Sequence, residues 1–352
     1  MKTNFFRSAF VACVSLALMA TVYTSCTPEE TTPGNTTILV ALIDSCQTMV
    51  DAATTVDYPQ ASIDAFSSAL DVVKQAILDT KLSQTEVNNL AVSLRAARET
   101  FMASEFDAIS PTALLMGLSF NEGTGTQLTA AGKGWTAVLK KGPAEIFGTA
   151  TNFPSFITGK VGKAMYFSNG SHLEISNYTA ADLLGRKLSI AVWIKPDSTR
   201  AGNYIMSYNY WKSWKFQLED HNKPFFSTTT GAGGMDADNE VVFSAPNGEW
   251  THLVVSMDLT NGKLVFYVNG VNTKEWTSQT QPNLTGTLSA YATTLPLMVG
   301  ACTTYTEALT WDWSWAHTPA NWDGLIGAMD ELKLYNIALT DGQVSKLYNE
   351  EK

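Results

Sequence analysis

Cysteine is scarce in this chain, which holds only 4 in 352 residues. No two of them have the Cys-x-x-Cys spacing, which argues against a zinc site. Cys13 and Cys26 lie near the N-terminus, so Cys46 and Cys302 are the two that remain for the folded part. These two can pair in an oxidising compartment, but they lie in different predicted domains, and we expect two buried thiols instead.

Positive charge is also in short supply. The chain has 23 Lys and Arg against 33 Asp and Glu, a formal net charge of -10, and no cluster of basic residues. An acidic surface repels a phosphate backbone, so nucleic acid is not expected as a partner. Hydrophobic residues make up 45% of the sequence, and with this length they leave room for about two globular domains.

The first 25 residues have the pattern of a targeting signal and not of a domain. Lys2 and Arg7 precede an apolar run over 9–20 that is too short to span a bilayer. The Thr24-Ser25-Cys26 that follows resembles the lipobox of bacterial lipoproteins, in which the cysteine carries the lipid. This resemblance implies that Cys26 is lipidated and becomes the new N-terminus.

A short acidic segment follows this cysteine. Thr27-Pro28-Glu29-Glu30 is similar to the surface-export signal of Bacteroidota lipoproteins. The similarity implies an outer-membrane lipoprotein that is exposed at the cell surface and attached to the membrane by its acyl chains. An ordinary cleaved secretory signal is the alternative. Residues 26–36 are polar and hold too few apolar side chains to fold, so we expect an extended tether.

Residues 37–107 show helical periodicity in three segments. The second segment follows Asp57, which suits a cap, and Pro59, which suits a first turn; the third begins at Ser83, with Glu86 at capping-box spacing. The short connections predict antiparallel neighbours. The Tyr-Pro start and the Ser-Gln-Thr-Glu-Val turn resemble the FIVAR-type helical modules of bacterial surface proteins, which implies a spacer or a weak surface contact.

From Ser110 onward, apolar residues alternate with polar ones, as half-buried strands require. Asn-Gly pairs at 169–170, 261–262 and 269–270 indicate hairpin turns. We therefore predict that residues 108–352 form a sandwich of two antiparallel sheets, so that the chain is multidomain, α-helical first and all-β afterwards. The predicted strands are 113–120, 163–168, 172–176, 188–195, 203–208, 214–219, 224–229, 250–259, 264–269, 273–276, 295–300 and 325–334.

Several short motifs follow one another along this all-β region. They are Leu118-Ser119-Phe120-Asn121-Glu122-Gly123, Gly162-Lys163-Ala164-Met165-Tyr166-Phe167-Ser168-Asn169-Gly170, Leu188-Ser189-Ile190-Ala191-Val192-Trp193-Ile194-Lys195-Pro196, Trp250-Thr251-His252-Leu253-Val254-Val255, Leu264-Val265-Phe266-Tyr267-Val268-Asn269-Gly270, Met298-Val299-Gly300 and Met329-Asp330-Glu331-Leu332-Lys333-Leu334-Tyr335-Asn336. In this order and spacing they resemble the LamG-like branch of the concanavalin A-like lectin/glucanase fold, over about 110–350. The resemblance implies a jelly roll that binds carbohydrate.

The predicted closing strand contains Asp330, a carboxylate that a sheet can hold only if hydrogen-bond donors or a cation meet it. We predict that this strand pairs with the first strand of the sandwich. In the family that the chain resembles, a structural calcium commonly joins these two places. The resemblance therefore implies Asp330, Asn121 and Gly123 as ligands of a structural Ca²⁺. The alternative is an Asp330 held by backbone donors or by Lys333.

Aromatic rings that can stack on the CH faces of sugars gather in two stretches of the sandwich, residues 208–214 and residues 311–317 extended by 321–323, the Trp-rich stretch. The second stretch is an insertion before the closing strand, rich in Trp, Asp, Asn and His. It is either a docking platform for a glycan or a lid over the core, and we favour the platform. The candidate carbohydrate-binding residues are Tyr210 and Trp211 in the first stretch, and Trp311, Trp313, Trp315, His317 and Trp322 in the second.

Catalytic motifs are missing from the sequence. Glucanases of this broad fold carry two Glu on one strand, separated by an Asp, and neither Glu-x-Asp-x-Glu nor Glu-x-Asp-x-x-Glu occurs here. The nearest acidic cluster, Glu219-Asp220-His221, is expected at a strand end, as a solvated edge or a rim around a ligand. We therefore expect a non-catalytic surface lipoprotein that captures polysaccharide. An adhesion lipoprotein that contacts proteins and a divergent glycoside hydrolase are the alternatives.

Overall fold

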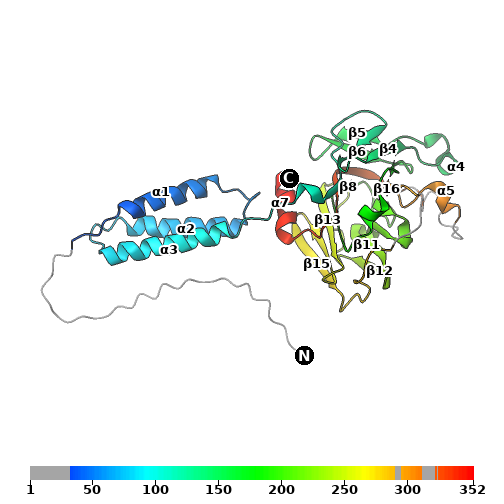
Figure 1. Cartoon of the computed structure of the whole chain (residues 1–352). Coiled ribbons are helices and arrows are strands. Elements are labelled where there is room, and N and C mark those ends of the chain that lie inside the picture. The colour runs from blue at the N-terminus through cyan, green and yellow to red at the C-terminus, as the bar shows by residue number, and fades with distance from the viewer. Residues whose placement is uncertain (1–31, 290–294, 311–321, 323) are drawn as a thin grey trace, which may run out of the picture.

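The computed structural model describes residues 32–289, 295–310, 322 and 324–352, which form a bundle of helices followed by a β-sandwich (Figure 1). This is the fold class that the sequence predicts. Among the described helices, none is both long enough and apolar enough to cross a bilayer. The predicted signal, Cys26 and the first part of the tether lie outside the described residues.

The long helices lie towards the two ends of the chain, and the strands lie between them, together with two single helical turns. The helices are α1 (Thr37–Ala52), α2 (Gln60–Ala76), α3 (Gln84–Met102), the single turns α4 (Ala144–Phe147) and α5 (Tyr305–Ala308), and α7 (Asp341–Glu351). The strands are β1 (Leu114–Leu118), β2 (Gln127–Thr129), β3 (Ala131–Gly132), β4 (Thr136–Lys140), β5 (Ser155–Thr158), β6 (Lys163–Phe167), β7 (His172–Ile175), β8 (Lys187–Pro196), β9 (Asn203–Tyr208), β10 (Trp214–Glu219), β11 (Lys223–Thr230), β12 (Gly233–Asp238), β13 (Thr251–Asp258), β14 (Lys263–Val268), β15 (Val271–Thr277), β16 (Leu297–Val299) and β17 (Gly327–Tyr335).

The helical bundle has the predicted cap. The hydroxyl of Ser83 accepts from the backbone N–H of Glu86 at 3.3 Å, and the Glu86 carboxylate accepts from the backbone N–H of Ser83 at 2.7 Å. This reciprocal pair at the start of α3 confirms the predicted capping box. The apolar faces of α1, α2 and α3 meet in a small core that contains Phe66, Phe101 and the buried free thiol of Cys46.

The sandwich consists of two antiparallel sheets. The first runs β15-β14-β13-β8-β17-β1-β3, with β6 also paired to β17 and β5 paired to β6; the second runs β12-β11-β10-β9-β16-β7-β4-β2. Side chains of the inner faces, such as Trp214, Phe216 and Phe266, form the main core. Cys302 is buried and free, in a different cluster from Cys46, which confirms the prediction of two buried thiols.

The closing strand β17 lies between β1 and β8. Leu334 pairs with Met116 of β1 on one side and with Ile190 of β8 on the other. The pairing with β8 is interrupted by a bulge directly after Asp330, where Glu331 has a φ of +47°. The predicted pairing of the first and last strands is therefore confirmed, and it joins the two ends of the sandwich.

Five short strands were not predicted from the sequence: β2, β3, β4, β5 and β12. β12 reads Gly-Gly-Met-Asp-Ala-Asp, a composition typical of a loop, yet Met235 and Ala237 are buried at alternate positions and the strand pairs with β11 along its whole length. β2 and β3 have three and two residues, which is too short for a period-two pattern to be recognised.

Helix α7 covers the outer face of the first sheet and carries Glu351 into a buried cluster of charges. One carboxylate oxygen of Glu351 accepts from the indole N–H of Trp193 at 2.8 Å, and the other pairs with the ammonium group of Lys333. Lys333 also lies 2.8 Å from the carboxylate of Glu331. Burial lowers the pKa of Lys333, but the two carboxylates outweigh it and hold the pKa above its ordinary value, so this lysine stays charged.

The same helix contacts the helical bundle. The ammonium group of Lys346 lies 2.9 Å from the carboxylate of Asp57, and the Asn349 side chain donates to the backbone carbonyl of Thr55 at 2.7 Å. Figure 1 shows α7 between the bundle and the sheets. The last residues of the chain therefore connect its two folded parts.

Removing the Glu351 carboxylate should destabilise the sandwich. In Glu351→Ala, Lys333 loses a buried partner and Trp193 loses its acceptor, which we expect to lower the free energy of unfolding by about 3 kcal/mol. Chemical denaturation measures this loss. The exposed neighbour provides the control, because Glu350→Ala should change the same quantity by less than about 0.5 kcal/mol. Equal stability of the two variants would contradict the importance of the cluster.

Candidate functional site

Asp330 is fully buried at the bulge of β17, and backbone N–H groups meet its carboxylate. Val161 donates to one oxygen and Glu331 to the other, each at 2.8 Å. The side-chain oxygen of Asn121 reaches the same turn between β5 and β6, where it accepts from the backbone N–H of Lys163 at 2.8 Å. The structure thus brings two of the three predicted calcium ligands to one turn, and it also supplies the backbone donors of the alternative.

Glycines allow both side chains to approach this turn closely. A Cβ added to Gly159 would stand 2.4 Å from a carboxylate oxygen of Asp330, and one added to Gly162 would stand 2.2 Å from the side-chain oxygen of Asn121. Gly123, the third predicted ligand, follows Asn121 closely with a φ of +66°. Larger residues at the two turn positions would push the oxygens away, so the turn depends on its glycines.

The charge of Asp330 is costly in this environment. Burial raises the pKa of its carboxyl to about 6 from 3.8, although the backbone donors at Val161 and Glu331 lower it. This shift corresponds to about 3 kcal/mol against the ionised folded state at neutral pH. The stability that the residue contributes is therefore highest below about pH 4, falls as the pH rises to about 6, and is lowest above it.

The oxygen atoms of Asp330 and Asn121 are of the chemical type that binds calcium. Carboxylate and amide oxygens are hard ligands, and an oxygen that accepts one N–H keeps a lone pair for a cation. Within the described ranges, no group of three or more His, Cys, Asp or Glu side chains suits a metal. Backbone carbonyls and water would therefore have to complete the six to eight ligands that Ca²⁺ takes.

The outer face of the second sheet carries polar side chains that are buried. Lys215 of β10 stands opposite Ser207 of β9 and Ser227 of β11, and Gln217 follows on the same face. Phe216, which lies between them in β10, points into the main core. The outer face of an antiparallel sheet is commonly solvated, yet Lys215 is only 2% exposed. This part of the sheet is therefore enclosed by other residues.

Aromatic rings surround the ammonium group of Lys215. It lies 4.8 Å from the ring centroid of Tyr210, 5.2 Å from that of Phe225 and 5.6 Å from that of Tyr204. It also donates to the side-chain oxygen of Gln217 at 2.6 Å. Burial lowers the pKa of Lys215 to about 8, so most molecules keep the charge at neutral pH. Cation–π attraction then holds the three rings around one positive charge.

One residue from each predicted sugar-binding stretch lies at this face. Tyr210 and Trp322 are 4% and 3% exposed, and they share one buried cluster with Tyr204, Cys302 and Ala308. The indole N–H of Trp322 has no hydrogen-bond acceptor in the described part of the chain. Tyr210 has a left-handed backbone with a φ of +53°, a conformation that non-glycine residues adopt mostly where the surroundings impose it.

The packing of these two rings bears on the choice between platform and lid. Buried rings are what a lid requires, whereas a platform needs exposed ring faces, so the role of Tyr210 and Trp322 as sugar ligands stays a prediction. Three tryptophans and one histidine among the other predicted sugar ligands lie outside the described residues: Trp311, Trp313, Trp315 and His317. The backbone of Trp211 is described, but its side chain is not.

Sequence reasoning did not single out Lys215, Gln217 or Phe225. The observed bounds of β10 equal the predicted strand 214–219, and the alternation of its residues places Lys215 and Gln217 on one face. No pattern within β10 indicates that this face is covered, because the covering rings come from other elements: Tyr204 from β9, Tyr210 from the turn before β10 and Phe225 from β11. The burial of the lysine was therefore not predictable from its own strand.

The first sheet has a shallow cleft of about 440 Å³ beside the start of α7. Its carboxylates are already engaged. Asp258 lies 3.1 Å from the ammonium group of Lys187, and Asp341 accepts from the hydroxyl of Tyr267 at 2.7 Å. The cleft lacks a ring cluster such as that around Lys215 among its described lining residues, so the second sheet is the better candidate.

A comparison with known protein families agrees with this architecture. The family described as the concanavalin A-like lectin/glucanases superfamily matches residues 167–345. No curated protein matches the chain in sequence. Domain 4 of AbnA, a GH43 extracellular arabinanase from Geobacillus stearothermophilus solved in complex with arabinotriose, is 20% identical, with a TM-score of 0.47 over 68% of this chain and 100% of that one.

Two further solved structures are similar in fold. The binding domain of Paraclostridial Mosquitocidal Protein 1 is 13% identical, with a TM-score of 0.48 over 68% of this chain and 52% of that one. A heptameric SAP-like pentraxin from Limulus polyphemus is 16% identical, with a TM-score of 0.33 over 46% of this chain and 69% of that one. At these identities the similarity concerns the fold alone.

A calcium ion at Asp330 should stabilise the protein in a pH-dependent way. At pH 7 the ion offsets the cost of the buried charge, so Ca²⁺ should raise the melting temperature and EDTA should lower it again. At about pH 4 the carboxyl is protonated, and both effects should vanish. Asp330→Ala should lower the melting temperature and remove its dependence on EDTA, whereas the exposed Asp107→Ala should change neither.

The melting temperature at pH 7 also decides between the two readings of Asp330. If Ca²⁺ and EDTA leave it unmoved, the backbone N–H groups of Val161 and Glu331 hold the carboxylate without a metal.

Proposed function

The chain belongs to the concanavalin A-like lectin/glucanases superfamily, and from this membership we propose that its sandwich captures polysaccharide without cleaving it. The sugar would dock at the outer face of the second sheet, near Tyr210 and Trp322. The observation that supports this proposal is that these two residues, selected from two separate stretches of the sequence, belong to one cluster. Both rings are covered in this cluster, so they would contact the sugar through hydrogen bonds and not through open ring faces.

Trp322 belongs to the same buried cluster as Tyr204 of β9. Its ring packs edge-on against that of Tyr305 in α5, with 5.5 Å between the ring centroids. Its buried indole N–H has no acceptor among the described residues, and a sugar hydroxyl or a water molecule at this place would satisfy it. The residues that would stack on or hydrogen-bond to the sugar are Tyr210, Trp211, Trp311, Trp313, Trp315, His317 and Trp322.

Lys215 would act beneath these residues as a positioning residue. Its ammonium group contacts the rings of Tyr204, Tyr210 and Phe225 and would hold these three rings in one arrangement before the sugar arrives. A site whose rings are ordered in advance loses less conformational entropy on binding. A lysine buried at a cost to its own charge is also more typical of a functional site than of a core.

The rest of the chain would deliver the sandwich to its ligand. We propose that Cys26 carries the lipid of an outer-membrane lipoprotein exposed at the cell surface, that residues 26–36 form the tether, and that the FIVAR-like bundle is a spacer. The contact between Lys346 and Asp57 supports a spacer, because it holds the bundle against the sandwich. A structural calcium at Asp330 would brace the closing strand.

The acidic cluster at the end of β10 supports a binding role over a catalytic one. Glu219 lies 3.7 Å from the ammonium group of Lys223, which itself lies 2.7 Å from Asp238. Both carboxylates are thus paired with the same lysine, whereas a glycosidase needs two carboxyl groups that flank the bond to be cleaved. This arrangement therefore suits the rim of a binding site.

Polysaccharide binding by purified residues 27–352, which lack the proposed lipid-bearing Cys26, tests the proposal. Affinity electrophoresis and calorimetry on a panel of polysaccharides should identify at least one ligand. The double variant Trp311→Ala plus Trp315→Ala should weaken its Kd by about tenfold or more without lowering the melting temperature. Lys215→Met should weaken binding by a smaller factor, and the surface control Lys263→Ala on the first sheet should bind like the wild type.

Three outcomes would count against this proposal. Failure of the wild type to bind any polysaccharide of the panel would favour the adhesion alternative. Release of reducing sugar from a bound polysaccharide would show a hydrolase. Full affinity in the double tryptophan variant would place the site elsewhere on the protein.

A further inference from the structure

Three consecutive apolar side chains stand out from the loop between β12 and β13. Val241, Val242 and Phe243 are 47%, 54% and 54% exposed. In the part of the chain that the structure describes, no other three neighbours in sequence are large, apolar and exposed to this extent. Exposed apolar groups of this kind commonly contact a ligand or a partner. We call residues 241–243 the apolar tip.

Hydrogen bonds hold the apolar tip in one conformation. The fully buried Asn239 donates to the hydroxyl of Ser244 at 2.7 Å, and this hydroxyl donates to the carbonyl of Val241 at 2.7 Å. The backbone N–H of Phe243 donates to the carbonyl of His221 at 2.6 Å. The tip is therefore bound both to its own loop and to the neighbouring loop between β10 and β11.

The backbone around the apolar tip is strained. His221, Asn222, Glu240 and Phe243 all have a left-handed φ, between +51° and +64°. This conformation is unfavourable for a bulky residue such as Phe243, and such strain is concentrated at functional sites. Its ring packs edge-on against that of His221, with centroids 5.5 Å apart and an angle of 86° between the rings. The strain and the packing hold an aromatic ring in a half-exposed position.

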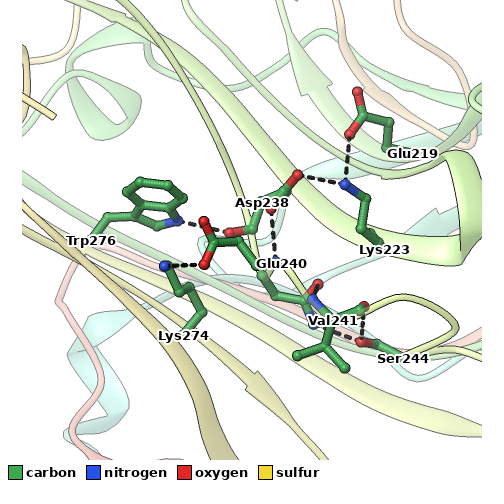
Figure 2. Close-up of polar contacts among 9 residues, drawn as sticks. Glu219, Lys223, Asp238, Glu240, Val241, Ser244, Lys274 and Trp276 are labelled. Atoms are coloured by element: carbon green, nitrogen blue, oxygen red, sulfur yellow. Dashed lines mark hydrogen bonds and ion pairs between the residues drawn. The ribbon is translucent and has the colours of Figure 1, made fainter. Parts of the chain in front are cut away.

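The charges beneath the apolar tip are paired, and the more exposed ones are acidic. Figure 2 shows Lys223 between Glu219 and Asp238, and Lys274 paired with Glu240. The ammonium group of Lys223 lies 3.7 Å from the carboxylate of Glu219 and 2.7 Å from that of Asp238. The side chains of the two lysines are 21% and 24% exposed, against 36% for Glu219 and 56% for Glu240. A ligand that approaches the tip meets carboxylates before ammonium groups, which disfavours anionic sugars and anionic lipid surfaces.

The apolar tip follows β12, the edge strand of the sheet that carries the ring cluster around Lys215. Asp238 ends β12 opposite Phe225 of β11, and Phe225 is one of the rings around that lysine. The indole N–H of Trp276 donates to the carbonyl of Asp238 at 2.7 Å and so fastens this end of the second sheet to β15 of the first, as Figure 2 shows. The tip therefore lies two strands away from β10, at the edge of the outer face.

We propose that the apolar tip is a second contact for the captured glycan and that this glycan is neutral, an inference that rests on the proposed capture of polysaccharide. Phe243 would stack on the CH face of a sugar ring, with Val241 and Val242 beside it. The carboxylates of Glu240 and Asp220 would accept hydrogen bonds from its hydroxyl groups.

The size of the apolar tip fits a sugar better than a protein. Three half-exposed side chains offer on the order of 250 Å². This area matches one or two sugar rings, but it falls well below the roughly 800 Å² that each partner contributes to a stable protein interface. The acidic surroundings exclude anionic polymers as preferred ligands, so a neutral polysaccharide is the class of ligand that fits both the area and the charge.

A substitution that suits the strained backbone tests this contact. Asparagine adopts a left-handed φ readily, so Phe243→Asn removes the ring without opposing the loop conformation. We expect a melting temperature equal to or above that of the wild type, and a Kd for a neutral polysaccharide that is weaker by about tenfold or more. The control is Phe153→Asn, which removes another half-exposed phenylalanine, 43% exposed, and should bind like the wild type.

The probes are xylan, arabinan, mannan and mixed-linkage β-glucan as neutral polysaccharides, and polygalacturonate and chondroitin sulfate as acidic ones. Full affinity in Phe243→Asn, together with loss of affinity in the double variant Trp311→Ala plus Trp315→Ala, would overturn the second contact and leave the proposed function intact. A wild-type preference for the acidic probes would overturn the neutral ligand. Binding of none of the six by the wild type would overturn the proposed function itself.

Sedimentation and vesicle binding test the two other possible occupants of the apolar tip. If the wild type self-associates or binds phosphatidylcholine vesicles, and Phe243→Asn abolishes that behaviour while its glycan affinity is intact, the tip is a protein or membrane contact and the inference is wrong. Equal behaviour of the wild type and Phe243→Asn in both assays supports the glycan contact.

Discussion

The sandwich depends on the insertion of β17 between β1 and β8. This pairing joins the first and last strands of an all-β domain, so the sheet can close only after the whole chain is present. The bulge in β17 then directs Asp330 toward the β5–β6 turn and Lys333 toward α7. One strand thus fixes the register of the first sheet, the buried carboxylate and the C-terminal helix together.

Two buried charges in the sandwich, those of Asp330 and Lys215, are stabilised in different ways. We therefore assign Asp330 a structural role and Lys215 a role in the proposed site. Backbone N–H groups meet Asp330, and a cation at the same turn would add to them. Lys215 has aromatic rings and the amide of Gln217 around it instead. The first arrangement holds the closing strand against the β5–β6 turn. The second orders rings on the face of the second sheet where we propose that a glycan binds.

What the sequence predicted, and what it could not, follows from how local each signal is. The capping box at Ser83 and the hairpin turn at Asn269-Gly270, with φ values of +50° and +80°, depend on neighbours in the chain and were predictable. β12 was missed because its composition is that of a loop, although Met235 is buried as in a strand. The burial of Lys215 depends on rings from other elements, which no pattern within β10 reveals.

The central claim is that the outer face of the second sheet binds a glycan. Hydrogen–deuterium exchange of residues 27–352, with and without a bound polysaccharide, tests it most directly. The ligand should slow exchange in β9, β10 and β11 and in the segment around Trp322, while β13, β14 and β15 of the first sheet remain unchanged. Slower exchange confined to the first sheet or to the helical bundle would contradict the claim.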